Sequence, residues 1–273
     1  LDNPGFQAMY GETGPAFFRA VHALVGGREY AIFGANAMLA TGTIPVTSVL
    51  ALQVFRRRDV AVFAGAVLAV MPLHLRFSAA EDAIIPGTLF AVWSLVLALD
   101  WVDRRRPESL VGLVATLALV MQSRTELLAF PAFVVGFTVA CRPWDRVRRA
   151  LGWPVIVALG ILTILVFPRL LHFLSSPLMP GDPMGFLGRL NNYLNPINVR
   201  RLHVFFHSSI TPPMLWALAL AGGVWAWRWS RRRALLALAV VGIGYFVLTS
   251  WFSSNPPFLR RTQVLCTPFW SIV

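Results

Sequence analysis

Arginine residues gather in four clusters along this chain of 273 residues, and long apolar segments separate the clusters. The clusters lie at 56–58, 104–106, 142–149 and 228–233. Cytoplasmic loops of membrane proteins carry the excess of Lys and Arg, so clusters that return after every second apolar segment mark the same membrane face each time. The pattern predicts a chain that crosses a membrane many times and has its chemistry on the loops of the other face.

The composition excludes an ordinary soluble domain. Hydrophobic residues make up 57% of the chain and charged residues 13%, whereas about a quarter of the residues in soluble domains are charged. A net charge of +12 would suggest nucleic acid in a soluble protein, but more than half of the 24 basic residues lie in the four clusters, where topology accounts for them. We therefore expect membrane lipid, and no nucleic acid, among the partners.

The apolar segments predict an all-α, polytopic integral membrane protein. A helix needs about 20 residues to span a hydrocarbon core of roughly 30 Å, and by this measure we expect about eight to nine transmembrane helices. The expected spans are 30–55, 60–77, 83–102, 110–121, 127–141, 154–174, 213–229, 234–252 and a segment that starts at Gln263.

The fourth and fifth spans are short. One helix from Arg106 to Arg142 would be on the order of 50 Å long and would place two arginine clusters on opposite faces. We expect two short spans instead, or a re-entrant pair that turns at 122–126.

The outer loops are expected at 78–82, 122–126, 175–212 and 253–262, together with the residues before Tyr30. Apolar residues from Phe17 to Val25 follow a helical period, and Gly26 with Gly27 provides a stop. This pattern predicts an amphipathic helix on the outer membrane surface. The arginine rule places Arg57, Arg105, Arg146 and Arg232 in the cytoplasm and Glu81, Arg124, Asn192 and Asn255 outside.

We interpret 1–273 as a single transmembrane domain: an outer segment, 1–29, and a helical bundle, 30–273, with its outer loop at 175–212. The chain opens at Leu1 without a methionine and stops at Val273 inside an apolar segment. We therefore expect this domain to be truncated at both ends.

Glu81 and Asp82 are candidate catalytic residues because they share a short outer turn between two spans. Neighbouring carboxylates at a membrane interface raise one another's pKa, which suits the handling of a proton, a cation or a sugar hydroxyl. A solvated helix N-cap is the alternative reading of the same residues.

Arginines supply the candidate substrate-binding residues. Arg124 and Glu126 lie at the outer end of short spans, where they could contact substrate or form an ion pair that closes the turn. Arg260 and Arg261 precede an apolar segment and could bind a phosphate or anchor the chain in lipid headgroups. Arg76, just before the turn that holds Glu81, completes the substrate-binding set.

No metal site is predicted. His203 and His207 have the spacing of a zinc protease motif, but Val204 occupies the place of its glutamate. No phosphate-binding loop or dinucleotide fingerprint occurs, so the cofactor is unknown; a divalent cation is possible and is not required by the sequence.

Several motifs give the chain a resemblance to the GT-C membrane glycosyltransferases, in particular to the protein O-mannosyltransferase and aminoarabinose-transferase branch. The segment 14–27 is similar to the end of that family's first outer loop, and 60–81 to its alanine-rich third helix with a proline and an acidic turn. Residues 123–131 resemble an Arg-x-Glu turn, and 257–268 a late outer loop in which Thr262 replaces the usual tyrosine.

The resemblance implies a transferase of the bacterial inner membrane. Such enzymes take a monosaccharide from a polyprenyl-phosphate carrier and pass it to a lipid, glycan or protein acceptor on the outer face. It also implies a general base in the first outer loop, for which Asp2 and Glu12 are the candidates here and a residue upstream of Leu1 is the alternative. The alternative functions are a transporter or flippase for a lipid-linked or anionic substrate, which should show inverted repeats, and a scaffold subunit.

Overall fold

The computed structural model describes residues 13–26, 30–78, 84–123, 127–128, 130–175 and 271–272. All regular secondary structure in these ranges is helical, as the composition predicted. The helices are α2 (Thr13–Val25), α3 (Tyr30–Phe55), α4 (Arg58–Val70), α5 (Pro72–Ser78), α6 (Ile84–Arg104), α7 (Pro107–Ser123), α8 (Phe130–Cys141), α9 (Trp144–Ala150) and α10 (Trp153–Ser175).

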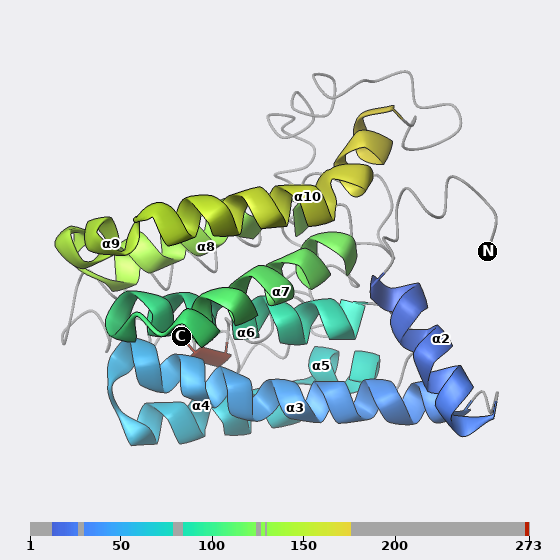
Figure 1. Cartoon of the computed structure of the whole chain (residues 1–273). Coiled ribbons are helices and arrows are strands. Elements are labelled where there is room, and N and C mark those ends of the chain that lie inside the picture. The colour runs from blue at the N-terminus through green and yellow to red at the C-terminus, as the bar shows by residue number, and fades with distance from the viewer. Residues whose placement is uncertain are drawn as a thin grey trace, which may run out of the picture.

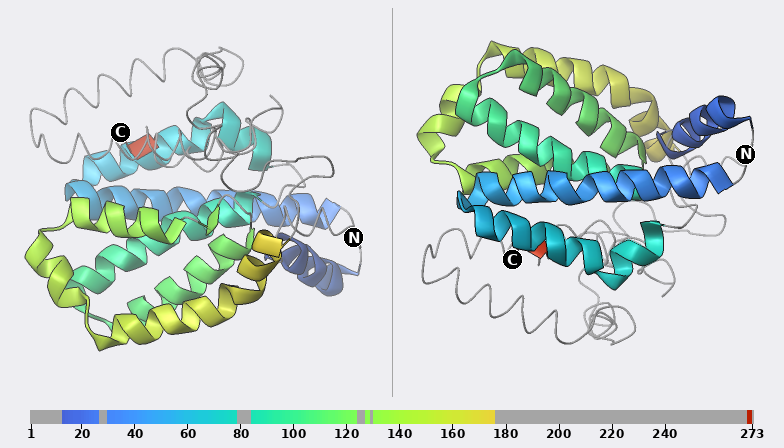
Figure 2. Two further views of the ribbon diagram at one scale, coloured as in Figure 1. Left: turned by 90° about the horizontal axis from the view of Figure 1, so that it is seen from above. Right: turned by 90° about the horizontal axis from the view of Figure 1, so that it is seen from below.

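The long helices lie alongside one another, with α6 in the middle of the bundle (Figures 1 and 2). It contacts α3, α7 and α8 along the bundle and α2 and α9 at its ends. Its side chains are buried almost all around, and Val92, Leu95 and Leu99 have no exposed surface. In the described part of the chain, α3, α6 and α10 are long and apolar enough to cross a membrane.

The span predicted at 60–77 is broken into α4 and α5. Met71, between them, has an extended backbone with φ −67° and ψ 119°. Its successor is Pro72, and a proline ring disfavours the helical conformation of the residue before it. The expectation of one uninterrupted helix was therefore wrong at this point.

The prediction of two short helices between the second and third arginine clusters is confirmed. The chain forms α7 and α8, with residues 127–128 in a short 3₁₀ segment before α8. The two arginine-flanked ends lie close together, because Arg105 Nη2 donates a hydrogen bond to the carbonyl oxygen of Arg146 at 3.3 Å.

The predicted N-terminal amphipathic helix and its glycine stop are also confirmed. Helix α2 ends at Val25, and Gly26 follows it with a φ of +70°, a conformation that glycine adopts without steric cost. In Figure 1, α2 runs steeply across the direction of the other helices. Its place on the outer membrane surface remains a prediction.

The later predicted elements lie outside the described residues, apart from Ser175, Ser271 and Ile272. They are the outer loop 175–212, the spans 213–229 and 234–252, and the segment from Gln263. The count of eight to nine transmembrane helices therefore stays a prediction.

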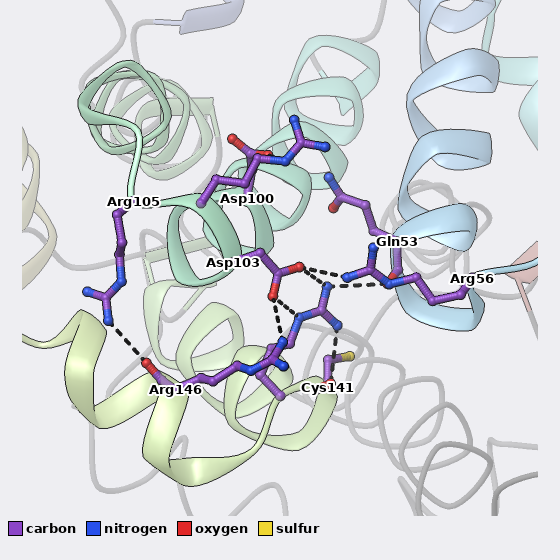
Figure 3. A network of polar contacts seen from close by, with 9 residues as sticks. Gln53, Arg56, Asp100, Asp103, Arg105, Cys141 and Arg146 are labelled. Carbon is purple, nitrogen blue, oxygen red and sulfur yellow. Dashed lines mark hydrogen bonds and ion pairs between the residues drawn. The ribbon is translucent and has the colours of Figure 1, made fainter.

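Three of the four arginine clusters meet at one end of the bundle, as the topology argument requires. Asp103, near the end of α6, is the centre of this network (Figure 3). Arg142 donates to both of its carboxylate oxygens, from Nε to Oδ1 at 2.7 Å and from Nη2 to Oδ2 at 2.6 Å. Arg56 Nη2 lies 2.9 Å from Oδ2, and Arg146 Nη1 lies 3.8 Å from Oδ1.

Arg142 is the buried member of this network, with 5% of its side chain exposed. Its remaining donors reach main-chain carbonyls, those of Cys141 at 3.2 Å and Gln53 at 3.3 Å. The guanidinium thus joins α6 to the ends of α3 and α8. Which membrane face this arginine end occupies remains a prediction from the charge pattern.

We predict that Asp103→Asn destabilises the protein by on the order of 3 kcal/mol, because it leaves the buried Arg142 guanidinium without its counter-charge. Arg56→Gln is the matched control: that side chain is 60% exposed, and exposed ion pairs contribute about 0–1 kcal/mol. Thermal unfolding of the purified variants in one detergent gives the comparison. Equal losses for the two variants would contradict the central place of Asp103.

A second prediction concerns the tight contact between α6 and α7. A Cβ at Gly87 would lie 2.7 Å from Ser123 Oγ, whereas one at Gly42 would meet nothing within 4 Å. We expect Gly87→Ala to cost about 1–3 kcal/mol through overpacking. Gly42→Ala should be neutral or stabilising, since alanine is the better helix former. The two unfolding temperatures, measured side by side, test this; a Gly87→Ala protein as stable as the control would refute it.

Candidate active site

The candidate active site lies at the end of the bundle opposite the arginine end. Helices α3, α6 and α8 begin there, while α7 and α10 end there and α5 lies nearby (Figure 1). This arrangement follows from chain direction. Helices α3, α6 and α8 run toward an arginine cluster and therefore start at this end, whereas α7 and α10 run away from one and end here. Helix α2 lies across the same end (Figure 2).

Side chains of α2 and α7 hold this end together through main-chain acceptors. The hydroxyl of Thr13 donates to the carbonyl oxygen of Leu119 at 2.8 Å, which fastens α2 to α7. The amide of Gln122 donates to the carbonyl oxygen of Leu165 at 3.1 Å, which fastens α7 to α10. Both donors come from stretches that the sequence placed at the outer face, so the amphipathic helix and the predicted turn meet at one end.

The turn between α7 and α8 is anchored on both sides by buried residues. Ser123 has no exposed surface, and its hydroxyl donates to the carbonyl oxygen of Val120 at 2.7 Å. Leu127 is 1% exposed and belongs to the main hydrophobic core. Both residues lie close to Gly87 near the start of α6. The hydrophobic core therefore fixes the positions of Ser123 and Leu127, the described residues on either side of this turn.

Arg169 is a candidate that the sequence analysis missed. It lies on α10 directly after Pro168 and is only 6% exposed. The last part of α10 bends away from the helix axis (Figure 1), as expected where a proline removes a main-chain hydrogen bond. A charged residue inside a predicted span was the signal available, because ionised side chains in membrane helices are costly and usually functional.

His74 is a second buried polar residue near this end. It is 2% exposed, and its Nε2 donates to the carbonyl oxygen of Ala40 at 3.1 Å, which ties α5 to α3. Its Nδ1 has no hydrogen-bond partner among the residues that the structure describes. The sequence gave no reason to single out this histidine, because only the fold brings it against α3.

Of the predicted site residues, only Arg76 lies in the described part of the chain. It occupies the last turn of α5 and is exposed. The others lie outside the described residues: Asp2, Glu12, Glu81, Asp82, Arg124, Glu126, Arg260, Arg261 and, for the rejected metal site, His203 and His207. Their roles stay predictions. The described residues on either side of two of these groups, Ser78 with Ile84 and Ser123 with Leu127, all belong to this end of the bundle.

The described residues contain no group of three or more His, Cys, Asp or Glu side chains that could hold a metal ion. The described polar groups of this end are instead hydroxyls, amides, histidines and arginines. Such a set can donate hydrogen bonds and attract an anion, but it contains no carboxylate to act as a base. A base at this end must come from the predicted outer residues.

Comparisons with known proteins support the architecture. No family model matches the chain, and no curated protein sequence matches it. Among solved structures, the crystal structure of ArnT from Cupriavidus metallidurans bound to undecaprenyl phosphate superposes on 97% of this chain and 49% of that chain, with a TM-score of 0.68 and 17% sequence identity. The chain thus spans about half the length of ArnT and shares its fold.

This likeness confirms the coarse form of the fold prediction: the chain shares the ArnT fold, and the described secondary structure is all helical. Membership of the GT-C superfamily, and of a particular branch of it, stays a prediction. At this level of identity the shared property is the fold, and the function requires its own argument.

Proposed function

We propose that this protein is a membrane glycosyltransferase that takes a monosaccharide from a polyprenyl-phosphate carrier. The observation that carries the proposal is the fold shared along nearly the whole chain with ArnT, a protein whose crystal structure contains undecaprenyl phosphate. The motif resemblance at 60–81, 123–131 and 257–268 points independently to the same class. The acceptor is a lipid, a glycan or a protein on the outer face of the bacterial inner membrane.

The end opposite the arginine network is the natural place for the reaction. Arg169 is buried there on α10, and Arg76 is exposed there on α5. The charge pattern also assigns that end to the outer face, where the acceptor would be found.

The reaction needs a base and an anion clamp. A carboxylate must deprotonate the acceptor, and cations must stabilise the carrier phosphate as it leaves with the bond electrons. Glu81 and Asp82 are the proposed carboxylates of the turn between α5 and α6, with Asp2 and Glu12 as candidates of the first outer loop. Arg260 and Arg261 are the proposed clamp, and Arg124, Glu126 and Arg76 complete the substrate contacts.

Arg169 joins this proposed clamp because of its burial and position. A guanidinium can donate parallel hydrogen bonds to two phosphate oxygens. We place its side chain near the outer end of the α10 span, the depth at which a carrier phosphate would lie when its polyprenyl tail is in the hydrocarbon. The low exposure of Arg169 means that such a contact would be shielded from water, which strengthens it.

Transfer of radiolabelled sugar from a polyprenyl-phosphate donor by the purified protein tests the function. We predict that Glu81→Gln with Asp82→Asn lowers turnover by at least about tenfold, roughly 1.4 kcal/mol in the barrier, because the change removes the charge and keeps the shape. Asp59→Asn at the arginine end is the control. If the double variant turns over at the wild-type rate, these carboxylates serve only as a helix cap. If the wild type transfers no sugar but moves labelled carrier across a vesicle membrane, the flippase reading replaces the transferase.

The arginine clamp is tested by Arg→Lys changes at 169, 260 and 261, which keep the charge and lose the planar fork. We expect donor KM or turnover to worsen by about tenfold at the positions that bind phosphate. Arg58→Lys, at an exposed position of the arginine end, should have no effect. Wild-type kinetics at 260 and 261 would assign that pair to lipid anchoring. Reduced stability at 169 without a change in donor KM would assign Arg169 to packing.

A further inference from the structure

We propose that the arginine end of the bundle binds the headgroup of an anionic phospholipid between Arg105 and Arg149. Two exposed tryptophans lie close to Arg149 along the chain: Trp144 on the same helix, α9, and Trp153 at the start of α10. The proposal is independent of the transferase reaction, which we place at the opposite end.

The first argument is an excess of positive charge that the protein itself does not neutralise. At this end Asp103 serves Arg56, Arg142 and Arg146. Asp59 pairs with Arg57 and Asp100 with Arg104, and Glu108 and Asp145 are the other described acidic residues of this end. No ion pair joins Arg105 or Arg149 to an acidic side chain of the described residues.

Both arginines are nevertheless held in place. The Arg105 guanidinium lies over the Trp101 ring, with its Cζ 5.6 Å from the ring centre, and donates to the carbonyl oxygen of Arg146 at 3.3 Å. Arg149 Nε donates to the carbonyl oxygen of Asp145 at 3.1 Å. These contacts orient the two guanidinium groups and do not neutralise their charges. Each group has five N–H donors, so further donors remain that can bind a ligand.

The backbone at Arg105 supports a role for its side chain. Its φ of +58° lies in the left-handed region, where glycine is the unstrained choice and another residue costs about 1 kcal/mol or more. The same conformation ends α6, because the Arg105 N–H donates to the carbonyl oxygen of Trp101 at 3.0 Å. Glycine would end α6 at this position with less backbone strain, yet the chain has an arginine there.

Arg105 and Arg149 are also close enough to repel. Partial burial lowers the pKa of Arg105, and the neighbouring charge of Arg149 lowers it further. A phosphate between two guanidinium groups would replace this repulsion with charge-assisted hydrogen bonds. The chemistry of the pair thus fits a phosphate-bearing anion.

The exposed tryptophans near Arg149 indicate that the phosphate belongs to a lipid. Helix α9 buries Val147 and Ala150 against Val102 of α6. It leaves Trp144 54% exposed, and Trp153, at the start of α10, is 73% exposed. Tryptophans at a membrane boundary sit at the level of the headgroups. A phosphate held beside them would belong to a lipid of the adjacent leaflet, such as phosphatidylglycerol.

The test is native mass spectrometry of the full-length protein in detergent, with equal amounts of phosphatidylglycerol and phosphatidylcholine of matched chains. We expect wild type to retain phosphatidylglycerol and the Arg105→Gln, Arg149→Gln double variant to bind it about tenfold more weakly, or 1.4 kcal/mol. The control double variant, Arg58→Gln with Arg106→Gln, removes the same charge from exposed arginines of the same end and should bind like wild type. Arg149→Gln alone, at an exposed position, reports on the site even if the Arg105 change impairs folding.

Three outcomes would overturn the proposal. Equal retention of phosphatidylcholine would show that no anion is selected. An equal loss in the control double variant would show a diffuse attraction to positive charge. Displacement of the bound lipid by inorganic phosphate at the same concentration would identify a site for a soluble anion. Sugar transfer is not part of this readout, so its failure leaves the headgroup site unaffected.

Discussion

The pairing of Asp103 with Arg142 is the interaction on which the arginine end depends. A protein with arginines in every second loop brings like charges together wherever those loops meet, and their repulsion opposes packing of the helices. Asp103 offsets that repulsion with one carboxylate that serves three guanidinium groups. Burial of Arg142 makes the pair costly to break, since an uncompensated buried charge is much less favourable than either group in water.

The two ends of the bundle differ in how their helices finish. At the arginine end, α3 and α6 stop in left-handed arginines whose side chains then reach Asp103 of α6 and the main chain of α9 at Arg146. At the opposite end, helices are interrupted or bent by proline, at Pro72, the first residue of α5, and at Pro168 within α10. Ion pairs to Asp103 thus join the helices at the arginine end. Among the described residues, the other end is held by single hydrogen bonds to main-chain carbonyls.

This difference between the two ends of the bundle agrees with the proposed chemistry. A transferase that uses a lipid-linked sugar must admit the carrier from the membrane and the acceptor from water at the same place. Helix ends that meet at one face, with the arginines that we propose for the phosphate clamp, would meet that requirement. Anionic lipid at the arginine end would add a second contact with the membrane, besides the carrier at the opposite end. The two contacts together would fix the orientation of the helix bundle in the bilayer.

Sequence alone determined the features that depend on local or periodic properties. Apolar length predicted α3, α6 and α10, the glycine pair predicted the end of α2, and the spacing of the arginines predicted that α7 and α8 are separate helices with their arginine-flanked ends together. The candidate site was different: Glu81, Asp82, Arg260 and Arg261 came from charge placement and family resemblance, and they remain predictions. Arg169 was missed although its charge inside a predicted span was a signal, whereas His74 gave no signal because only its burial against α3 makes it important.

Only the tertiary structure decided which helix is central and which arginine meets Asp103. Helices α3 and α6 have similar hydropathy, yet 33% of an apolar 18-residue stretch of α3 and 67% of such a stretch of α6 is buried inside the protein. Lipid tails and neighbouring helices are equally apolar, so the sequence of a span does not reveal which of them it faces. The partner of a carboxylate is likewise set by the packing of helices that are distant in the chain, as Arg142 and Asp103 demonstrate.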